Sequence, residues 1–285
     1  MTQQGDWDIV TDVGISALAV AAARAIESHR PNRLMSDPYA ELFVAAAKPP
    51  TPMPTRPADI ADGSPWPDMA DYMGVRSRFF DEFLGGSSAQ AVLLAAGLDA
   101  RGYRLDWPSG AVVYELDMPK VLRFKQSVLD DHGVTPRATI RPVGVDLRDD
   151  WPTALLGSGF DRATPSAWLA EGLLPYLPDD AMQRLFTLVD QLSAPGSRLA
   201  AEHTDRDIRE LATRGPLASM AKESGLNVTD MVPGGKVFAP VRWLAEHGWR
   251  VTSTSIGPVA EGYGRPLGPN AGGLHHSVLI TATKA

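Results

Sequence analysis

The chain has 285 residues, of which 44% are hydrophobic and 21% charged, and its formal net charge at pH 7 is −7. This composition is typical of a globular protein, and the acidic balance argues against a broad nucleic-acid-binding face. The chain contains no cysteine, which excludes disulfides, thiolate nucleophiles and cysteine-ligated zinc.

The first part of the chain predicts helices around a proline-rich loop. Residues 12–30 and 36–47 have helical patterns, and the stretch DMADYMGVRSRFFDEFLGG predicts a third helix closed by Gly85 and Gly86. Residues 48–67 contain seven prolines, so we expect a surface loop or flap there. The acidic start lacks the basic region of a secretory signal, and Val13 to Ala23 is too short to span a bilayer. We therefore expect a cytoplasmic protein without a membrane partner.

From residue 90 onward, short apolar runs alternate with helical stretches. The predicted strands are 91–96, 111–116, 138–145, 165–170, 197–202, 249–256 and 277–283. The predicted helices are 118–132, 178–193, 206–224 and 240–247. This alternation indicates an α/β fold with a mainly parallel sheet covered on both faces. The link GPVAEGYGRPLGPNAGG predicts no helix, which favours an antiparallel hairpin of the last two strands at one sheet edge.

The turn after the first predicted strand is the strongest sign of a ligand site. In AVLLAAGLD, small residues around Gly97 would let the backbone approach a ligand closely. Asp117 follows the second strand, 20 residues beyond Gly97, where an acidic side chain can accept hydrogen bonds from ribose hydroxyls.

This turn does not fit a dinucleotide. The fingerprint would need glycines at 95, 97 and 100, but Ala95 and Ala100 occupy two of these positions. Asp99 would also repel a phosphate. A nucleoside cofactor without phosphate, S-adenosylmethionine, fits better than NAD. The alternative is an ordinary strand–turn–helix without a ligand.

Four segments together resemble the leucine carboxyl methyltransferase-like family of S-adenosylmethionine-dependent methyltransferases, in particular its actinobacterial branch. The segments are VRSRFFDEFL (75–84), LLAAGLDARGYRL (93–105), VYELDMPKVLRFK (113–125) and LAEGLLPYLP (169–178). The resemblance implies a Rossmann-like seven-stranded sheet of order 3-2-1-4-5-7-6 with strand 7 antiparallel. It also implies an N-terminal helical cap over residues 1–88, a methyltransferase core over 89–285 and a cap insertion at about 204–240.

The resemblance also assigns cofactor contacts. Arg76 matches the arginine that holds the methionine carboxylate. Independently, Arg76, Phe79, Phe80 and Phe83 share one helix face, and a guanidinium on an apolar face needs an anionic partner. A structural ion pair is the alternative for Arg76.

The remaining assignments follow the strand ends. Gly97 matches the glycine beside the methionyl group, and Asp117 matches the ribose-binding acid, with Glu115 ranked second. Asp146 and Leu147 match an Asp-Leu pair at the adenine. Glu171 would meet the ammonium of the cofactor, line the acceptor pocket or cap the following turn. Two departures are Ala95, where a glycine is more common, and a missing lysine near the N-terminus.

The resemblance implies O-methylation of a carboxylate on a small molecule. A carboxylate is already ionised at neutral pH and needs no general base. A hydroxyl or phenol acceptor would need one, and His203, expected in a loop after the fifth strand, is the best-placed candidate. The histidines show no metal-ligand spacing, so we expect no metal.

Two other functions stay open. A non-catalytic S-adenosylmethionine-binding protein would keep the same pocket without turnover. An NAD-dependent oxidoreductase is disfavoured by the missing glycines.

Overall fold

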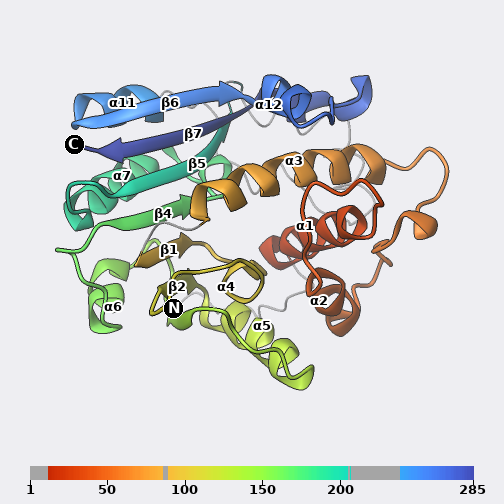
Figure 1. Cartoon of the computed structure of the whole chain (residues 1–285), viewed down its shortest axis with the longest axis horizontal. Coiled ribbons are helices and arrows are strands. Elements are labelled where there is room, and N and C mark those ends of the chain that lie inside the picture. Colours follow the sequence, from red (N-terminus) through yellow and green to blue (C-terminus); the bar gives the residue numbers. More distant parts are fainter. Residues whose placement is uncertain (1–11, 86–88, 205, 207–237) are drawn as a thin grey trace, which may run out of the picture.

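The computed structural model describes residues 12–85, 89–204, 206 and 238–285 (Figure 1). A seven-stranded sheet of order β3-β2-β1-β4-β5-β7-β6 forms its centre. Its strands are β1 Gln90–Leu94, β2 Val112–Asp117, β3 Thr139–Gly144, β4 Ser166–Ala170, β5 Arg198–Thr204, β6 Trp249–Ser255 and β7 Ser277–Lys284. Strand β7 is antiparallel to both neighbours, and the other described pairings are parallel. The predicted fold class and strand order are confirmed.

The chain order reverses between β1 and β4, which lie side by side with Gln90 opposite Ser166. All residues of both strands are buried, because helices cover them on both faces. In open α/β sheets, ligands bind beyond the carboxyl ends of strands at such a reversal. We therefore expect a ligand site among the segments that follow β1, β2, β4 and β5.

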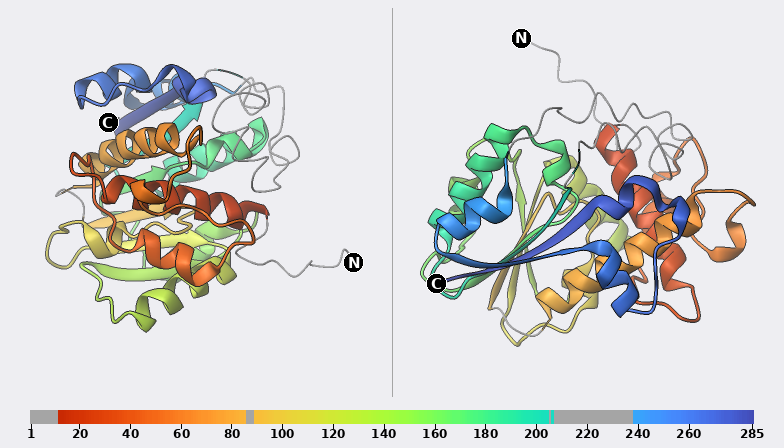
Figure 2. Two further views of the ribbon diagram at one scale, coloured as in Figure 1. Left: turned by 90° about the vertical axis from the view of Figure 1, so that its right-hand side faces the viewer. Right: turned by 90° about the horizontal axis from the view of Figure 1, so that it is seen from above.

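Helices lie on both faces of the sheet (Figure 2), and each face carries its own hydrophobic core. One face carries α4 (Arg101–Arg104), α5 (Pro119–Asp131) and the N-terminal helices, and the other carries α6 (Trp151–Gly157), α7 (Asp179–Leu192) and α11 (Pro240–Glu246). In β5, Ala200 belongs to the first core and Ala201 to the second, as strand alternation requires.

The N-terminal helices pack onto the first core. They are α1 (Asp12–Ser28), α2 (Ala40–Ala47) and α3 (Trp66–Leu84), joined by a mostly exposed proline-rich loop with one 3-10 turn, η1 (Pro57–Asp59). Alanines on the buried side of α1 allow close contact with α3. Buried Glu27 also pairs with Arg265, which lies between β6 and β7. The N-terminal helices thus share their core with the sheet; the division of the chain at residue 88 stays a prediction.

The link between β6 and β7 corrects one prediction. It contains α12 (Ile256–Gly262) and a further 3-10 segment, η3 (Pro269–His276), although the last two strands do pair antiparallel at the sheet edge. Gly257 and Pro258 suggested a loop, but both fall in the first turn of α12, where proline does not break a helix. The short turn η2 (Leu174–Tyr176) follows β4. The predicted helix 206–224 and nearly all of the proposed insertion at 204–240 lie outside the described residues.

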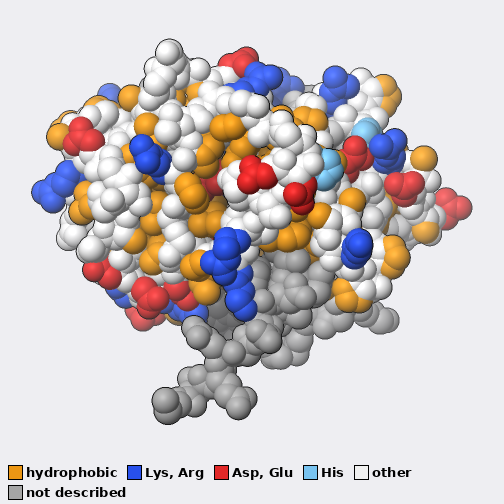
Figure 3. Space-filling view, turned by 90° about the horizontal axis from the view of Figure 1, so that it is seen from below, with side chains coloured by type: hydrophobic (Ala, Val, Ile, Leu, Met, Phe, Trp, Pro, Cys, Tyr) orange, Lys and Arg blue, Asp and Glu red, His pale blue; other side chains and the backbone are white. Residues whose placement is uncertain are grey.

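Strand β3 forms the other edge of the sheet. Its residues Thr139, Arg141 and Pro142 are exposed, and both a charged residue and a proline discourage pairing with another strand. Acidic and basic side chains are interspersed on this end of the molecule (Figure 3). Within the described residues, no helix is both long and apolar enough to span a membrane.

Candidate functional site

The turn between β1 and α4 has an unusual backbone course. Ala95 has φ of 52° and Gly97 has φ of 51°, both in the left-handed region. The amide of Ala96 donates to the carbonyl of Leu116, and the amide of Asp99 donates to the carbonyl of Ala96, each over 2.9 Å. Ala95 thus adopts the backbone conformation of a glycine in spite of its Cβ atom, at the cost of local strain.

Asp117 joins this turn to the end of β2. The amide of Gly97 donates to Oδ2 of Asp117 over 2.6 Å, and the amide of Met118 donates to Oδ1 over 2.6 Å. Each carboxylate oxygen has two acceptor positions, so each can accept a further hydrogen bond. Burial raises the pKa of Asp117 despite these two amides. Glu115 is buried within the sheet, with Oε2 2.8 Å from Nζ of Lys125 and Oε1 without a hydrogen-bond partner among the described residues. Its burial away from the turn supports Asp117 over Glu115.

Arg76 on α3 lies between two carboxylates, the partly buried Glu171 and the buried Glu202. Its Nε is 2.9 Å from Oε1 of Glu171, as an ion pair without hydrogen-bond geometry, and its Nη1 donates to Oε2 of Glu202 over 2.9 Å. Burial opposes its charge, but Glu202 and Glu171 together raise the pKa of Arg76 above its ordinary value. Phe80 and Phe83 are buried on the same helix, as predicted. The structure therefore shows the ion pairs that were the alternative for Arg76, and a contact of Arg76 with the methionine carboxylate stays a prediction.

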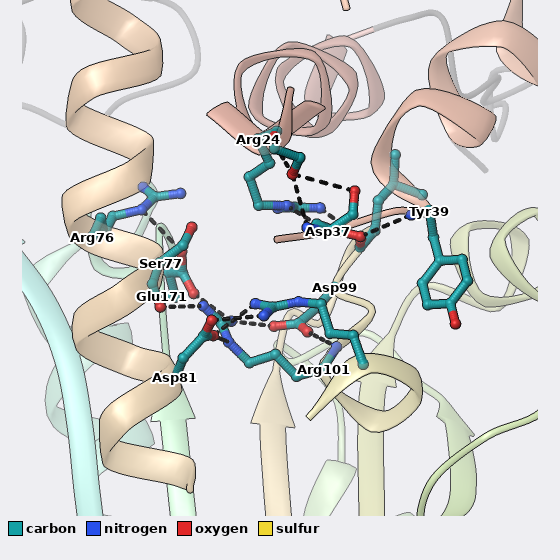
Figure 4. A network of polar contacts seen from close by, with 12 residues as sticks. Arg24, Asp37, Tyr39, Arg76, Ser77, Asp81, Asp99, Arg101 and Glu171 are labelled. Atoms are coloured by element: carbon teal, nitrogen blue, oxygen red, sulfur yellow. Dashed lines mark hydrogen bonds and ion pairs between the residues drawn. The ribbon is translucent and has the colours of Figure 1, made fainter. Parts of the chain in front are cut away.

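Glu171, directly after β4, connects Arg76 to a second arginine (Figure 4). Nη1 of Arg101 donates to Oε2 of Glu171 over 2.6 Å and also pairs with Asp99, while its Nε donates to Asp81 over 2.7 Å. Asp81 in turn accepts two hydrogen bonds of 2.6 Å from Arg104. The cluster thus contains three guanidinium groups and four carboxylates, Glu202 included.

The charge of Asp99 is compensated in this cluster. Burial alone would raise its pKa, but Arg101, Arg104 and Arg24 outweigh burial and lower the pKa of Asp99 to about 2. Because Arg101 offsets the charge of Asp99, this residue repels a phosphate less strongly than the sequence alone predicts. The choice of cofactor rests instead on the other features of the turn and on the relatives described below.

Glu202 was not predicted as a site residue. It is 4% exposed and accepts from Tyr72 and Ser277 at Oε1 and from Arg76 and the amide of Gly172 at Oε2. An acidic residue within the apolar strand LAAEHT is a sequence signal of a partnered or functional side chain. Its partners lie 30 to 130 residues away, however, so the sequence could not identify them.

Asp146 and Leu147 follow the carboxyl end of β3, on the same side of the sheet as the turns after β1 and β4. Arg148 donates to both oxygens of Asp146 over 2.5 to 3.0 Å, and these hydrogen bonds lower the pKa of Asp146. The negative charge of Asp146 contributes to the raised pKa of Asp117, which places the two carboxylates within electrostatic reach. Leu147 is half-buried against the second core.

His203 lies inside β5, not in a loop after it as predicted, because this strand extends to Thr204. Its cross-strand neighbour Val278 packs against the second core, whereas Glu202 faces α3. Strand alternation therefore directs His203 to the sheet face opposite the arginine cluster.

The residues at this edge suit a nucleoside cofactor that carries an amino-acid group. Asp117 offers acceptors beside the glycine turn, and Glu171 offers a carboxylate near Arg76 for a charged amino-acid end. Within the described residues, no group of three or more His, Cys, Asp or Glu is arranged to hold a metal ion.

Comparisons with known proteins agree with this fit. A model of the leucine carboxyl methyltransferase family matches residues 17–190. A Rhodococcus jostii (strain RHA1) protein named "Putative S-adenosyl-L-methionine-dependent methyltransferase" is 48% identical over 278 residues, covering 94% of this chain and 93% of its own. A Saccharopolyspora erythraea protein of the same name is 47% identical over 275 residues, covering 95% of each chain.

Two crystal structures share the fold. One is described as a "putative methyltransferase" from Thermobifida fusca, with a TM-score of 0.53, 17% identity and coverage of 92% of this chain and 94% of that one. The other is a DUF574 family protein from Streptomyces avermitilis, with a TM-score of 0.51, 15% identity and coverage of 94% and 97%. The family model spans more than half of the sequence, so the chain belongs to the leucine carboxyl methyltransferase family of S-adenosyl-L-methionine-dependent methyltransferases, and S-adenosyl-L-methionine is its cofactor.

Proposed function

We propose that this methyltransferase O-methylates a carboxylate of a small molecule. The observation that carries the proposal is the state of the carboxylates beside Arg76 and Arg101. Glu171, Glu202 and Asp99 are all engaged in ion pairs with guanidinium groups, so none of them is free to accept a proton from a hydroxyl acceptor. A carboxylate acceptor needs no base, because it is ionised at neutral pH.

We further propose how the chain holds its cofactor. Asp117 would accept from the ribose hydroxyls, Gly97 would allow close approach of the backbone, and Asp146 and Leu147 would contact the adenine. Arg76 would bind the methionyl carboxylate through Nη2, since Nε and Nη1 face Glu171 and Glu202. Glu171 would accept from the ammonium group.

When bound, the cofactor supplies an activated methyl group on a sulfonium. The work of the protein residues is then to align the acceptor and to exclude water. The buried ion pairs suit this task, because they fix side chains from α3, β5 and the turns after β1 and β4 relative to one another. Nearly all of the proposed cap insertion at about 204–240, where acceptor contacts are expected, lies outside the described residues.

A hydroxyl or phenol acceptor with His203 as base is the second candidate. Support for it is weaker, because His203 is directed to the other face of the sheet from Glu202. A protein that binds the cofactor without turnover is a third candidate. A role as an NAD-dependent oxidoreductase has no support from the relatives.

The test is formation of S-adenosylhomocysteine with two matched acceptor panels, small carboxylic acids and small phenols. We expect methyl esters from the acids, identified by mass spectrometry and by hydrolysis in mild base, and equal turnover in His203→Gln. Asp117→Ala serves as the control for cofactor-dependent turnover. Methylation of phenols that is lost in His203→Gln would replace the proposal by the second candidate. Cofactor binding without turnover on either panel would favour the third.

A further inference from the structure

One contact joins the N-terminal helices directly to the turn after β1. Nη2 of Arg24, on α1, donates to the carbonyl oxygen of Leu98 over 2.8 Å, across 74 positions of sequence. Arg24 is 7% exposed and Leu98 is 3% exposed, so the contact is shielded from water. A hydrogen bond from a charged donor in such surroundings is stronger than a neutral one.

The guanidinium of Arg24 is itself held in place. Its Nε donates to Oδ2 of Asp37 over 2.9 Å, and Asp37 is 1% exposed (Figure 4). The amide of Tyr39 donates to Oδ1 of Asp37, and the amide of Asp37 donates to Oγ of Ser28. Arg24 therefore connects three segments: α1, the chain before α2, and the turn.

The turn needs such support because of its conformation. Ala95 has φ of 52°, which is unfavourable for a residue with a Cβ atom. On the sheet side, Gly97 is fixed by Asp117. Beside it, Nζ of Lys125 donates to the carbonyl oxygen of Asp99 over 3.0 Å. Arg24 provides the restraint from the side of the N-terminal helices.

We propose that Arg24 is a positioning residue that couples the docking of α1 and α2 to the cofactor-binding conformation of the turn at 95–100. Cofactor binding to the turn then strengthens the docking of these helices, and their docking strengthens cofactor binding by the same factor. The inference rests on the proposed placement of the cofactor at this turn. Arg24 is assigned no direct contact with the cofactor.

The test uses the full chain and four variants. Arg24→Met removes the charge and keeps an unbranched apolar stem, and Arg24→Lys keeps a charge that can reach only one of the two partners. Asp37→Asn weakens the hold on Arg24. Arg30→Met is the matched control, because Arg30 forms ion pairs with Glu27 and Asp71 in the same helical region without contacting the turn.

Two measurements decide the outcome. Calorimetric titration with S-adenosylmethionine should show about tenfold weaker binding for Arg24→Met, an intermediate loss for Arg24→Lys and Asp37→Asn, and no change for Arg30→Met. Hydrogen exchange should show that the cofactor slows exchange of the amides of 14–28 and 40–47 in the wild type. This protection should be smaller in Arg24→Met, measured after circular dichroism has shown that the variant is folded.

Wild-type affinity in Arg24→Met and Asp37→Asn, or no cofactor-dependent protection of α1 and α2, would overturn the coupling. Asp117→Ala separates this failure from a failure of the underlying placement. If Asp117→Ala loses binding while Arg24→Met does not, only the coupling is wrong. If neither change affects binding, the cofactor does not use this turn, and both inferences fail.

Discussion

The buried Arg76 and the partly buried Glu171 form an ion pair in which Nε and Oε1 are 2.9 Å apart. The other oxygen of Glu171 accepts from Arg101, so one carboxylate joins α3 to the start of α4 across the end of β4. This arrangement explains how a site built from distant segments keeps its shape: the positions of its charged groups depend on one another.

Removal of Glu171 should therefore destabilise the whole protein. Glu171→Ala leaves two buried guanidinium groups short of a partner, and the loss of one partner of a buried pair costs about 3–5 kcal/mol. We expect this loss in the free energy of unfolding measured with urea. Glu246→Ala is the control, because its pair with Arg242 is exposed and should contribute less than about 1 kcal/mol. Equal effects of the two substitutions would show that the ion pairs of Glu171 contribute no more than a surface pair.

Asp117 should make cofactor binding sensitive to pH. Its carboxylate is the proposed acceptor for the ribose hydroxyls, and burial raises its pKa above the ordinary value of 3.8. Protonation removes acceptor capacity, so affinity for S-adenosylmethionine should fall as the pH falls through this raised pKa. Calorimetric titration of the wild type over a pH series should show the decline, and Asp117→Asn should bind weakly with a flatter profile. An unchanged affinity in Asp117→Asn would contradict the assignment.

Protonation of Asp99 in acid should lower the free energy of unfolding, as is usual for a carboxylate held in ion pairs. Its pKa is lowered to about 2 in the folded protein, against 3.8 for an ordinary aspartate. The stabilisation is therefore fully present above pH 3.8 and is lost as the pH falls toward 2. At about 1.36 kcal/mol per pKa unit, the contribution is on the order of 2 kcal/mol.

Urea unfolding of the wild type and Asp99→Asn at several pH values between 2 and 6 tests this contribution. The free energy of unfolding should fall less steeply with acid in Asp99→Asn than in the wild type. Parallel curves would show that Asp99 is not the group responsible.

The sheet was predictable from the sequence because its strands are short apolar runs with regular spacing. The placement of Gly97 and Asp117 at one site was also predictable, since small residues in a turn and an acid at the next strand end have a known geometric relation. The hydrogen bond between them is seen only in the structure. What could not be predicted is which charged groups meet. Arg76 was expected to have an anionic partner, but its contact with Glu202 depends on how α3 crosses the end of β5, 126 residues away.

The prediction that no helix lies between β6 and β7 was wrong for a local reason. Glycine and proline normally interrupt helices, but their effect depends on position, and in α12 both occupy the first turn. His203 was misplaced because a strand boundary depends on the partner strand. In the structure β5 pairs with β7 up to Thr204, opposite Ser277, and the sequence of β5 alone carries no sign of this.

Ala95 offers a test of the turn itself. Its φ of 52° favours glycine, so Ala95→Gly should relieve strain and raise the free energy of unfolding by roughly 0.5–1 kcal/mol. The gain is reduced by the greater chain entropy of glycine in the unfolded state. Gly97→Ala should have the opposite effect and lower the free energy of unfolding. A Cβ atom at this position would have no neighbour closer than 3.9 Å, so the loss would come from the positive φ of Gly97 and not from a clash.

Ala96→Gly is the matched control for Ala95→Gly, because the adjacent Ala96 has no positive φ and gains nothing from glycine. Urea unfolding should give opposite signs for these two substitutions, with a loss of about 1 kcal/mol in Ala96→Gly. S-adenosylmethionine should still bind Ala95→Gly, since glycine adopts the same backbone course without cost. If Ala95→Gly destabilises the protein as much as Ala96→Gly does, the turn does not hold Ala95 in the left-handed conformation, and the strained turn that Arg24 is proposed to position is absent.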